Sequence, residues 1–182
     1  MNIEQIIKNQ QLACDSENTI SSNDFEEVIV DGKTIEKHAM QDGVRNGESI
    51  YYKDGKISQR INYKDGKIFG AVEIYKNGSL NLIMNYKNEK PNGPMYVFEK
   101  GKLSQIGFYK DEKKHGKFFV FNNEYLSKEE NYKDDLLEGI SIIYYPKSTN
   151  IFEIGEYFAG DKNGSWKQFD LDGNIIKEEF FD

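Results

Sequence analysis

The sequence predicts an all-β protein: an elongated, single-layer antiparallel meander of about six to seven hairpin repeats of 23 residues, with a short N-terminal helix. Three observations support this prediction. An aromatic residue recurs five positions after each of a series of glycines. A tyrosine recurs sixteen positions after the same glycines. Asp-Gly and Asn-Gly pairs, which favour tight hairpin turns, separate the apolar segments. The leading glycines are spaced by 23 residues and are Gly47, Gly70, Gly93, Gly116 and Gly139.

The repeat is described most simply by offsets, counted from the leading glycine as zero. A shortened copy begins at Gly164 and a degenerate copy at Asp24, so the array is predicted to span residues 24–182. Offset five is Tyr52, Tyr75, Phe98, Phe121, Tyr144 and Phe169. Offset sixteen is Tyr63, Tyr86, Tyr109 and Tyr132, continued by Tyr157 and Phe181 once small insertions are allowed.

Residues 1–23 precede the array and are predicted to be a helix followed by a polar linker. Ile3, Ile6 and Ile7 have helical spacing among good helix formers, which indicates a helix over residues 3–13. Residues 15–23 are rich in turn and cap residues. Two roles remain open for the helix: a cap over the first strand, or an amphipathic segment that binds a partner.

Each repeat is predicted to contain two strands and two turns. In the copy that begins at Gly47, residues 48–52 form the first strand, 53–56 a turn, 57–63 the return strand and 64–67 the turn into the next copy. The turn over residues 146–150 is two residues longer than its equivalents, so we expect it to protrude.

Strand alternation predicts which side chains share a face. Strict alternation places offsets five, ten and sixteen on one face, with offset four and several irregular aromatic residues on the other. Regular aromatic residues of a repeat normally form its core, whereas irregular ones are better candidates for contact with a partner. The predicted partner-binding residues are Tyr51, Phe118, Tyr145 and Trp166.

Charge and composition exclude several classes of function. The net charge is −7, of which residues 1–46, with 4 basic and 9 acidic side chains, carry −5. The remaining residues, 47–182, hold 20 basic and 22 acidic side chains. They are therefore nearly neutral and have no basic stripe, which argues against nucleic acid as a partner. The same balance disfavours binding to anionic membranes.

No pattern in the chain predicts catalysis, a cofactor or a metal site. His38 and His115 lack ligand-like neighbours and are interpreted as surface residues, and no nucleophile, phosphate-binding or dinucleotide motif is present. Cys14 is the only cysteine, which is typical of a reducing compartment. Residues 1–14 lack a basic n-region and an apolar h-region, so neither export nor lipoprotein processing is expected. We therefore expect a non-enzymatic, cytoplasmic protein.

The glycine and aromatic series resembles the MORN-repeat family, and more closely its bacterial variant form. The stretch from Asn62 to Gly70, NYKDGKIFG, is the clearest match. The resemblance implies a twisted meander of hairpins that works by binding, as a scaffold, a membrane-associated module or an antitoxin-like partner of a bacterial toxin. Choline-binding repeats have a similar length but use a tryptophan-rich cage, and this chain has one tryptophan, Trp166.

Two classes of function remain open at this stage. The first is a protein-interaction module, antitoxin- or immunity-like, whose acidic N-terminal quarter favours a basic protein partner. The second is a peripheral membrane or phospholipid-binding repeat protein. Homo-oligomerisation is a further alternative, because an open meander has two exposed edges.

Overall fold

The computed structural model describes residues 24–182, and these residues form strands and turns without any helix. The all-β prediction is therefore confirmed for the described part of the chain. The predicted helix over residues 3–13 and the linker that follows lie outside the described residues.

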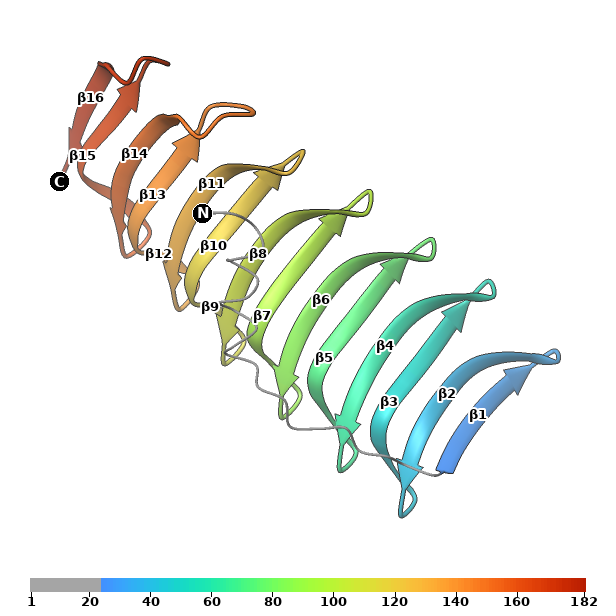
Figure 1. Ribbon diagram of the computed structural model, residues 1–182. Coiled ribbons are helices and arrows are strands. Elements are labelled where there is room, and N and C mark those ends of the chain that lie inside the picture. Colours follow the sequence, from blue (N-terminus) through green and yellow to red (C-terminus); the bar gives the residue numbers. More distant parts are fainter. Residues whose placement is uncertain (1–23) are drawn as a thin grey trace. The chain divides into compact units, whose positions relative to one another are not determined.

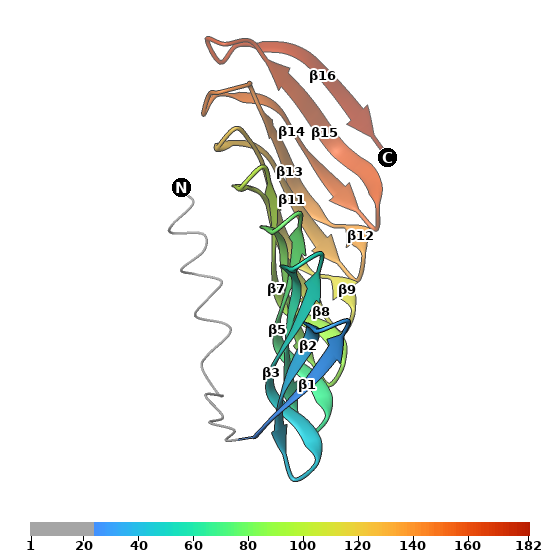
Figure 2. The ribbon, with the colours of Figure 1, turned by 90° about the vertical axis from the view of Figure 1, so that its right-hand side faces the viewer.

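The strands follow one another in the order of the sequence, and all pairings are antiparallel (Figure 1). The chain divides into two compact units, the first ending at Met95 and the second running from Tyr96 to Asp182. Within each unit the strands form a single layer (Figure 2). The strands are β1 (Asp24–Val30), β2 (Lys33–Gln41), β3 (Val44–Lys53), β4 (Lys56–Lys64), β5 (Lys67–Lys76), β6 (Ser79–Lys87), β7 (Lys90–Glu99), β8 (Lys102–Lys110), β9 (Lys113–Lys114), β10 (Gly116–Asn122), β11 (Tyr125–Lys133), β12 (Leu136–Leu137), β13 (Gly139–Tyr144), β14 (Ile151–Phe158), β15 (Asp161–Phe169) and β16 (Ile175–Phe181).

The meander topology is confirmed, with a small irregularity in two repeats. β9 pairs with β8, and β12 pairs with β11, each as a two-residue strand beside the main path. A single residue, His115 or Glu138, separates each short strand from the next one. The first strand of these two repeats is therefore interrupted just before its leading glycine.

The hairpin turns have the backbone conformation that their sequences predict. Asp54 and Gly55 both have positive φ, at 52° and 71°, as the central residues of a tight hairpin turn require. The turn over Asn123 and Glu124 lacks glycine but adopts the same conformation, with φ of 50° and 73°. Glu124 therefore occupies a region that is strained for a residue with a Cβ atom.

A β-bulge in the return strand of each hairpin overturns part of the predicted face assignment. In the β3–β4 hairpin Tyr51 pairs with Gln59 and Tyr52 pairs with Ile57, so Ser58 is an extra residue without a partner. Because one extra residue reverses the alternation beyond it, Tyr63 lies on the face of Tyr51 and not on the face of Tyr52. The hydroxyl oxygens of Tyr51 and Tyr63 are 3.3 Å apart, as this arrangement requires. The prediction that offset sixteen shares a face with offsets five and ten was wrong.

The same bulge recurs at offset eleven of other repeats. Register shifts occur after Ile74 in the β5–β6 hairpin and after Val120 in the β10–β11 hairpin. At this offset Ser58, Ser104 and Ser127 each donate a hydroxyl hydrogen bond, at 3.0–3.2 Å, to the carbonyl oxygen of offset four, which belongs to Tyr51, Val97 and Val120. The bulge is therefore a built feature of the repeat.

Each unit consequently has two faces, and each face carries its own rows of buried side chains. We call the face that carries offsets two, four, fourteen and sixteen the even face, and the face that carries offsets one, three, five, ten, thirteen and fifteen the odd face. In the two repeats with insertions, the inserted residues are left out of the offset, so that Tyr157 and Phe181 still have offset sixteen. On the even face of the first unit Val72, Met84 and Met95 are buried, and on the odd face of the second unit Ile106, Phe119 and Phe121 are buried. A single-layer sheet thus buries apolar side chains on both of its sides.

Neighbouring repeats are joined by hydrogen bonds between successive turns as well as by strand pairing. In the first unit Gly66 donates its N–H to the carbonyl oxygen of Arg45 at 2.9 Å, and Glu89 donates to that of Ile68 at 3.0 Å. In the second unit Asp135 donates to the carbonyl oxygen of Lys114 at 3.1 Å. These bonds satisfy backbone groups that a turn would otherwise leave to water.

Candidate functional site

Phe118, one of the predicted partner-binding residues, is buried within the sheet's own aromatic packing. It stands at offset two on the even face, with 6% of its surface exposed. Its ring makes edge-to-face contacts with Tyr109 and Tyr132, whose centroids lie 6.0 Å and 4.9 Å away. Gly107 leaves the room for it, since a Cβ atom there would lie 2.2 Å from Cε1 of the ring. Phe118 is therefore a packing residue of the second unit.

Trp166 occupies the equivalent position in the last repeat and is 4% exposed. Its ring lies over Gly155, where a Cβ atom would come within 2.1 Å, and contacts Tyr157 edge-to-face at 5.0 Å. The indole Nε1–H donates to the carbonyl oxygen of Glu156 at 3.1 Å. The ammonium group of Lys162 lies 3.9 Å from the ring centroid, in cation–π contact. Trp166 is therefore a packing residue of the last repeat.

Tyr145 and Tyr51, the other two predicted residues, are half-buried and hydrogen-bonded. The hydroxyl of Tyr145 donates to the carbonyl oxygen of Phe169 at 2.6 Å, and its ring contacts Phe152 edge-to-face. The hydroxyl of Tyr51 accepts from Nη1 of Arg45 at 3.0 Å. The structure therefore gives each of these four residues a place in the sheet's own packing, and their contact with a partner stays a prediction.

His38 corrects a second interpretation, because it is buried and only 1% exposed. It stands at offset fourteen of the degenerate first repeat, on the central row of the even face, where Ile61 and Met84 stand in later repeats. Its Nε2 atom lies 2.9 Å from a carboxylate oxygen of Glu36 and 3.1 Å from Nη2 of Arg45. Among the residues that the structure describes, none forms a hydrogen bond with its Nδ1 atom. This polar group belongs to the packing of the first unit.

The second unit exposes several large apolar residues that were not predicted as site residues, and three of them stand at offsets that are polar in some other repeats. Ile140, Phe158 and Phe180 are 59%, 66% and 76% exposed. Ile140 pairs with Glu156, two residues before Phe158, and Phe180 pairs with Ser165, so all three lie on the odd face. We call them the apolar set. They lie on the face opposite to Phe118 and Trp166.

At each position of the apolar set several other repeats carry a polar residue. Ile140 takes the offset of Glu48 and Lys117, which is Ala71 and Pro94 in two further copies. Phe158 takes an offset that is lysine in four earlier copies, and Phe180 one that is asparagine in three and phenylalanine in one. The equivalents of Phe158 are Lys64, Lys87, Lys110 and Lys133, and those of Phe180 are Asn62, Asn85 and Asn131. An alignment of the repeats with one another would have revealed this signal.

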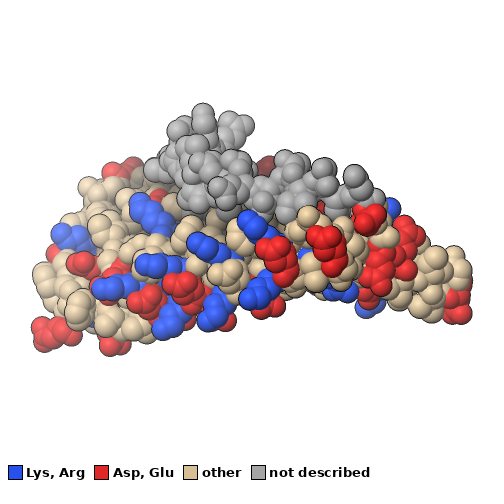
Figure 3. Space-filling model, turned by 90° about the horizontal axis from the view of Figure 1, so that it is seen from below, with Lys and Arg blue, Asp and Glu red and all other residues tan. Residues whose placement is uncertain are grey.

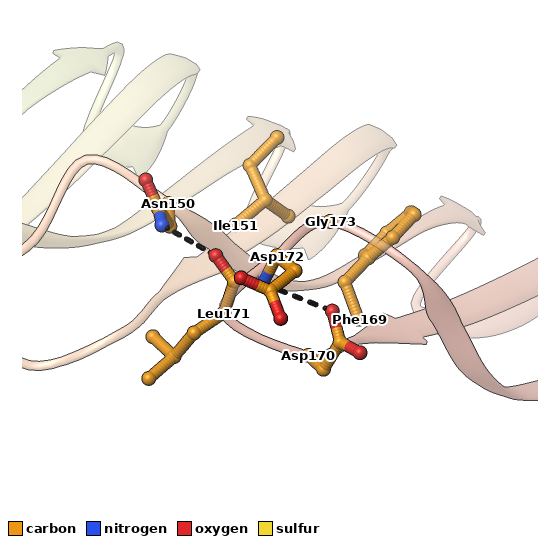
Figure 4. Close-up of a pocket in the computed structure, with 7 residues that line it drawn as sticks. All are labelled: Asn150, Ile151, Phe169, Asp170, Leu171, Asp172 and Gly173. Carbon is orange, nitrogen blue, oxygen red and sulfur yellow. Dashed lines mark hydrogen bonds between the residues drawn. The ribbon is translucent and has the colours of Figure 1, made fainter.

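A pocket of about 350 Å³ lies between two neighbouring turns of the second unit, and its lining includes Ile151, Phe169 and Asp170 (Figure 4). The longer turn is tied to the last one by a hydrogen bond from the Asn150 amide to the Leu171 carbonyl oxygen at 2.9 Å. The Asp170 carboxylate accepts from the side-chain amide of Asn174 and from two backbone N–H groups. These hydrogen bonds, first of all those from Asn174, hold the pKa of Asp170 below its usual range. The carboxylate organises the turn and leaves little for a ligand.

On the side shown in Figure 3, Lys and Arg are interspersed with Asp and Glu over much of the surface, and Asp and Glu gather towards its right-hand end. Across residues 24–182 no three His, Cys, Asp or Glu side chains are grouped so that they could hold a metal ion. Within the same residues no helix is long and apolar enough to cross a membrane.

These features define a class of protein, the single-layer β-hairpin repeat proteins. Its repeats are shaped by β-bulges and held together by hydrogen bonds between turns and by aromatic packing on the even face. The family model that matches the chain is that of the MORN repeat variant, over residues 45–65 and 162–182. The predicted resemblance is confirmed, and the two matches fall on repeats that begin at Gly47 and Gly164. MORN repeats are non-catalytic repeats. A search of curated proteins finds no match to this chain.

Proposed function

We propose that this chain is a non-enzymatic protein-interaction module that acts as an antitoxin- or immunity-like partner of another protein. The repeat family supports the coarser part of this proposal, since its members work as repeat proteins in interaction or membrane binding. The proposed contact surface is the odd face of the second unit, which differs from the even-face residues predicted from sequence.

The apolar set is the observation that carries this proposal. Large apolar side chains that are exposed together on one face are typical of protein-interaction sites. Most repeats carry lysine or asparagine where Phe158 and Phe180 stand, and no other full repeat carries a large apolar residue where Ile140 stands, so the fold of the repeat does not require these three side chains. Aromatic residues are also the commonest hot spots of protein interfaces.

Capture of a partner from a lysate of the native host tests the proposal. We would compare the wild-type chain with the triple variant Ile140→Glu, Phe158→Lys and Phe180→Asn. Each new residue occurs at the same offset of another repeat, and together they leave the net charge unchanged. The matched control is Tyr125→Ser, which replaces a tyrosine that is 47% exposed with the residue at the equivalent position, Ser79.

We expect the wild-type chain and the control to capture a stoichiometric protein partner. The triple variant should capture at least tenfold less of that partner. Equal capture by the triple variant and the wild type would move the contact away from the odd face. Co-sedimentation with phosphatidylglycerol vesicles separates the membrane alternative: salt-sensitive binding to vesicles, with no protein partner recovered, would overturn the proposal in favour of a lipid binder.

A further inference from the structure

The exposed large apolar side chains of the first unit gather in its first strands. Among the described residues of this unit they are Phe25, Ile29 and Val30 of β1 and Val44 of β3. Phe25 pairs with Ala39 and Ile29 pairs with Thr34, so both stand on the odd face. These two side chains are 59% and 60% exposed. We call Phe25 and Ile29 the β1 patch.

The charged groups beside the β1 patch are already paired. Glu27 stands between the two apolar residues on the same face and lies 3.4 Å from Nζ of Lys37. The ammonium group of Lys37 also lies 4.7 Å from the centroid of the Phe25 ring. An apolar segment can therefore cover this patch without burying an unpaired charge. The even face of β1 differs, because it carries the exposed Glu26 in place of a large apolar residue.

The chain itself supplies a segment with a matching apolar side. Residues 1–23 join β1 at Asp24, which directly precedes Phe25. The predicted helix over residues 3–13 carries three isoleucines on one side, and these are Ile3, Ile6 and Ile7. A helix of about 11 residues is marginal in water by itself and needs an apolar surface to lie on.

The dimensions of this segment fit the β1 patch. A helix over residues 3–13 is about 16 Å long at 1.5 Å per residue. Phe25 and Ile29 are four residues apart along a strand, or about 13 Å, so one such helix covers both. Residues 15–23 reach up to about 30 Å when extended, which is enough for the chain to turn back over β1.

We infer that residues 3–13 dock as a helix on the odd face of β1 and β2, with Ile3, Ile6 and Ile7 over the β1 patch. The segment is then a cap of the repeat array, of the kind that such arrays use to cover their ends. It is not an amphipathic segment held free for a partner. The proposed function concerns the second unit and does not depend on this contact.

A spin label tests the contact in the full-length chain. A nitroxide is attached to Cys14, the only cysteine, which directly follows residues 3–13. NMR measures its paramagnetic relaxation enhancement at methyl groups of Ile29 and Ala39 on the odd face and of Val28 and Ile61 on the even face. The spin-labelled, isotope-labelled chain is diluted into unlabelled chain, so that only contacts within one molecule are seen.

We expect the enhancement at the two odd-face residues to exceed that at the two even-face residues at least threefold. In the variant I3S/I6S/I7S the odd-face enhancement should fall at least fivefold. The control Q5S/N9S changes the opposite side of the predicted helix and should retain it. Phe25→Glu, which copies Glu48 at the same offset, should remove the contact from the side of the sheet.

Three results would overturn the inference. The first is an enhancement that is equal on the two faces or larger on the even face. The second is no enhancement anywhere in the first unit. The third is an enhancement seen only when isotope-labelled chain is mixed with separately spin-labelled chain, which would place the segment on a second copy.

Discussion

At the scale of single residues, size complementarity between neighbouring strands decides what each even-face position can hold. Phe118 and Trp166 fit because glycines stand beside them, and at the same two offsets in the first unit Val72 pairs with Ile61. Large and small residues thus alternate across the strand pair, so that the row is filled without overlap. A change at one position should therefore be felt at its partner.

Gly107 tests this complementarity. Gly107→Ile alone should lower the free energy of unfolding by about 3 kcal/mol, since its side chain would collide with the Phe118 ring. The double variant Gly107→Ile and Phe118→Val copies the Ile61–Val72 pair and should be more stable than Gly107→Ile, as measured by urea denaturation. A double variant no more stable than the single one would mean that the two positions do not share space.

The stability of the folded protein should depend on pH through Tyr132. Burial and the Glu130 carboxylate, which accepts from the hydroxyl at 3.0 Å, raise the pKa of the Tyr132 phenol to about 12 from 10.0. The unfolded chain loses this proton first, so the stabilisation is complete below pH 10 and is lost as the pH rises towards 12. Between pH 9 and about 12 the free energy of unfolding should therefore fall more for the wild type than for Tyr132→Phe. Denaturation at several pH values measures this difference. Parallel losses would show that the folded and unfolded phenols titrate alike.

At the scale of elements, the bulge determines which residues form each core. The extra residue at offset eleven sends offset sixteen to the even face, where Tyr132 packs against Phe118. Without the bulge this tyrosine would point to the other face. One extra residue, Ser127 in this hairpin and Phe152 in the next, thus decides the placement of every side chain beyond it.

Ser127 separates the two contributions of the bulge. Ser127→Ala removes the hydroxyl hydrogen bond to Val120, 3.0 Å long, and should cost about 1 kcal/mol. Deletion of Ser127 reverses the faces of residues 128–133 and should cost well over about 3 kcal/mol, with Tyr132 moved to the wrong side. Thermal denaturation of both variants measures this, and a deletion as mild as the alanine substitution would contradict the assigned register.

The sequence predicted the hairpins well and the faces badly, for a physical reason. Turn residues such as Asp54-Gly55 carry a strong local preference for positive φ, so strand boundaries could be inferred. A bulge has no such requirement, and its only sign was a recurring Ser or Asn at offset eleven, as in Ser58 and Asn81. Burial of Phe118 and His38 depends on neighbours in adjacent strands, which only the register reveals.

At the scale of the whole molecule, the array combines a regular scaffold with departures from regularity in its last repeats. The scaffold accounts for the buried rows, the turn-to-turn bonds and the rings on the even face. The apolar set is not needed by it and lies in the second unit. The proposed function therefore places recognition in the second unit and gives the regular repeats a supporting role.

Site-specific photo-crosslinking tests this assignment most directly. A benzophenone amino acid would replace Phe158 on the odd face, or Tyr125 at the start of β11, in the chain expressed in its native host. We expect one discrete crosslinked protein from position 158 and none from position 125. Mass spectrometry detects the crosslinked product. The absence of a crosslink at position 158, with the same protein captured from position 125, would contradict it.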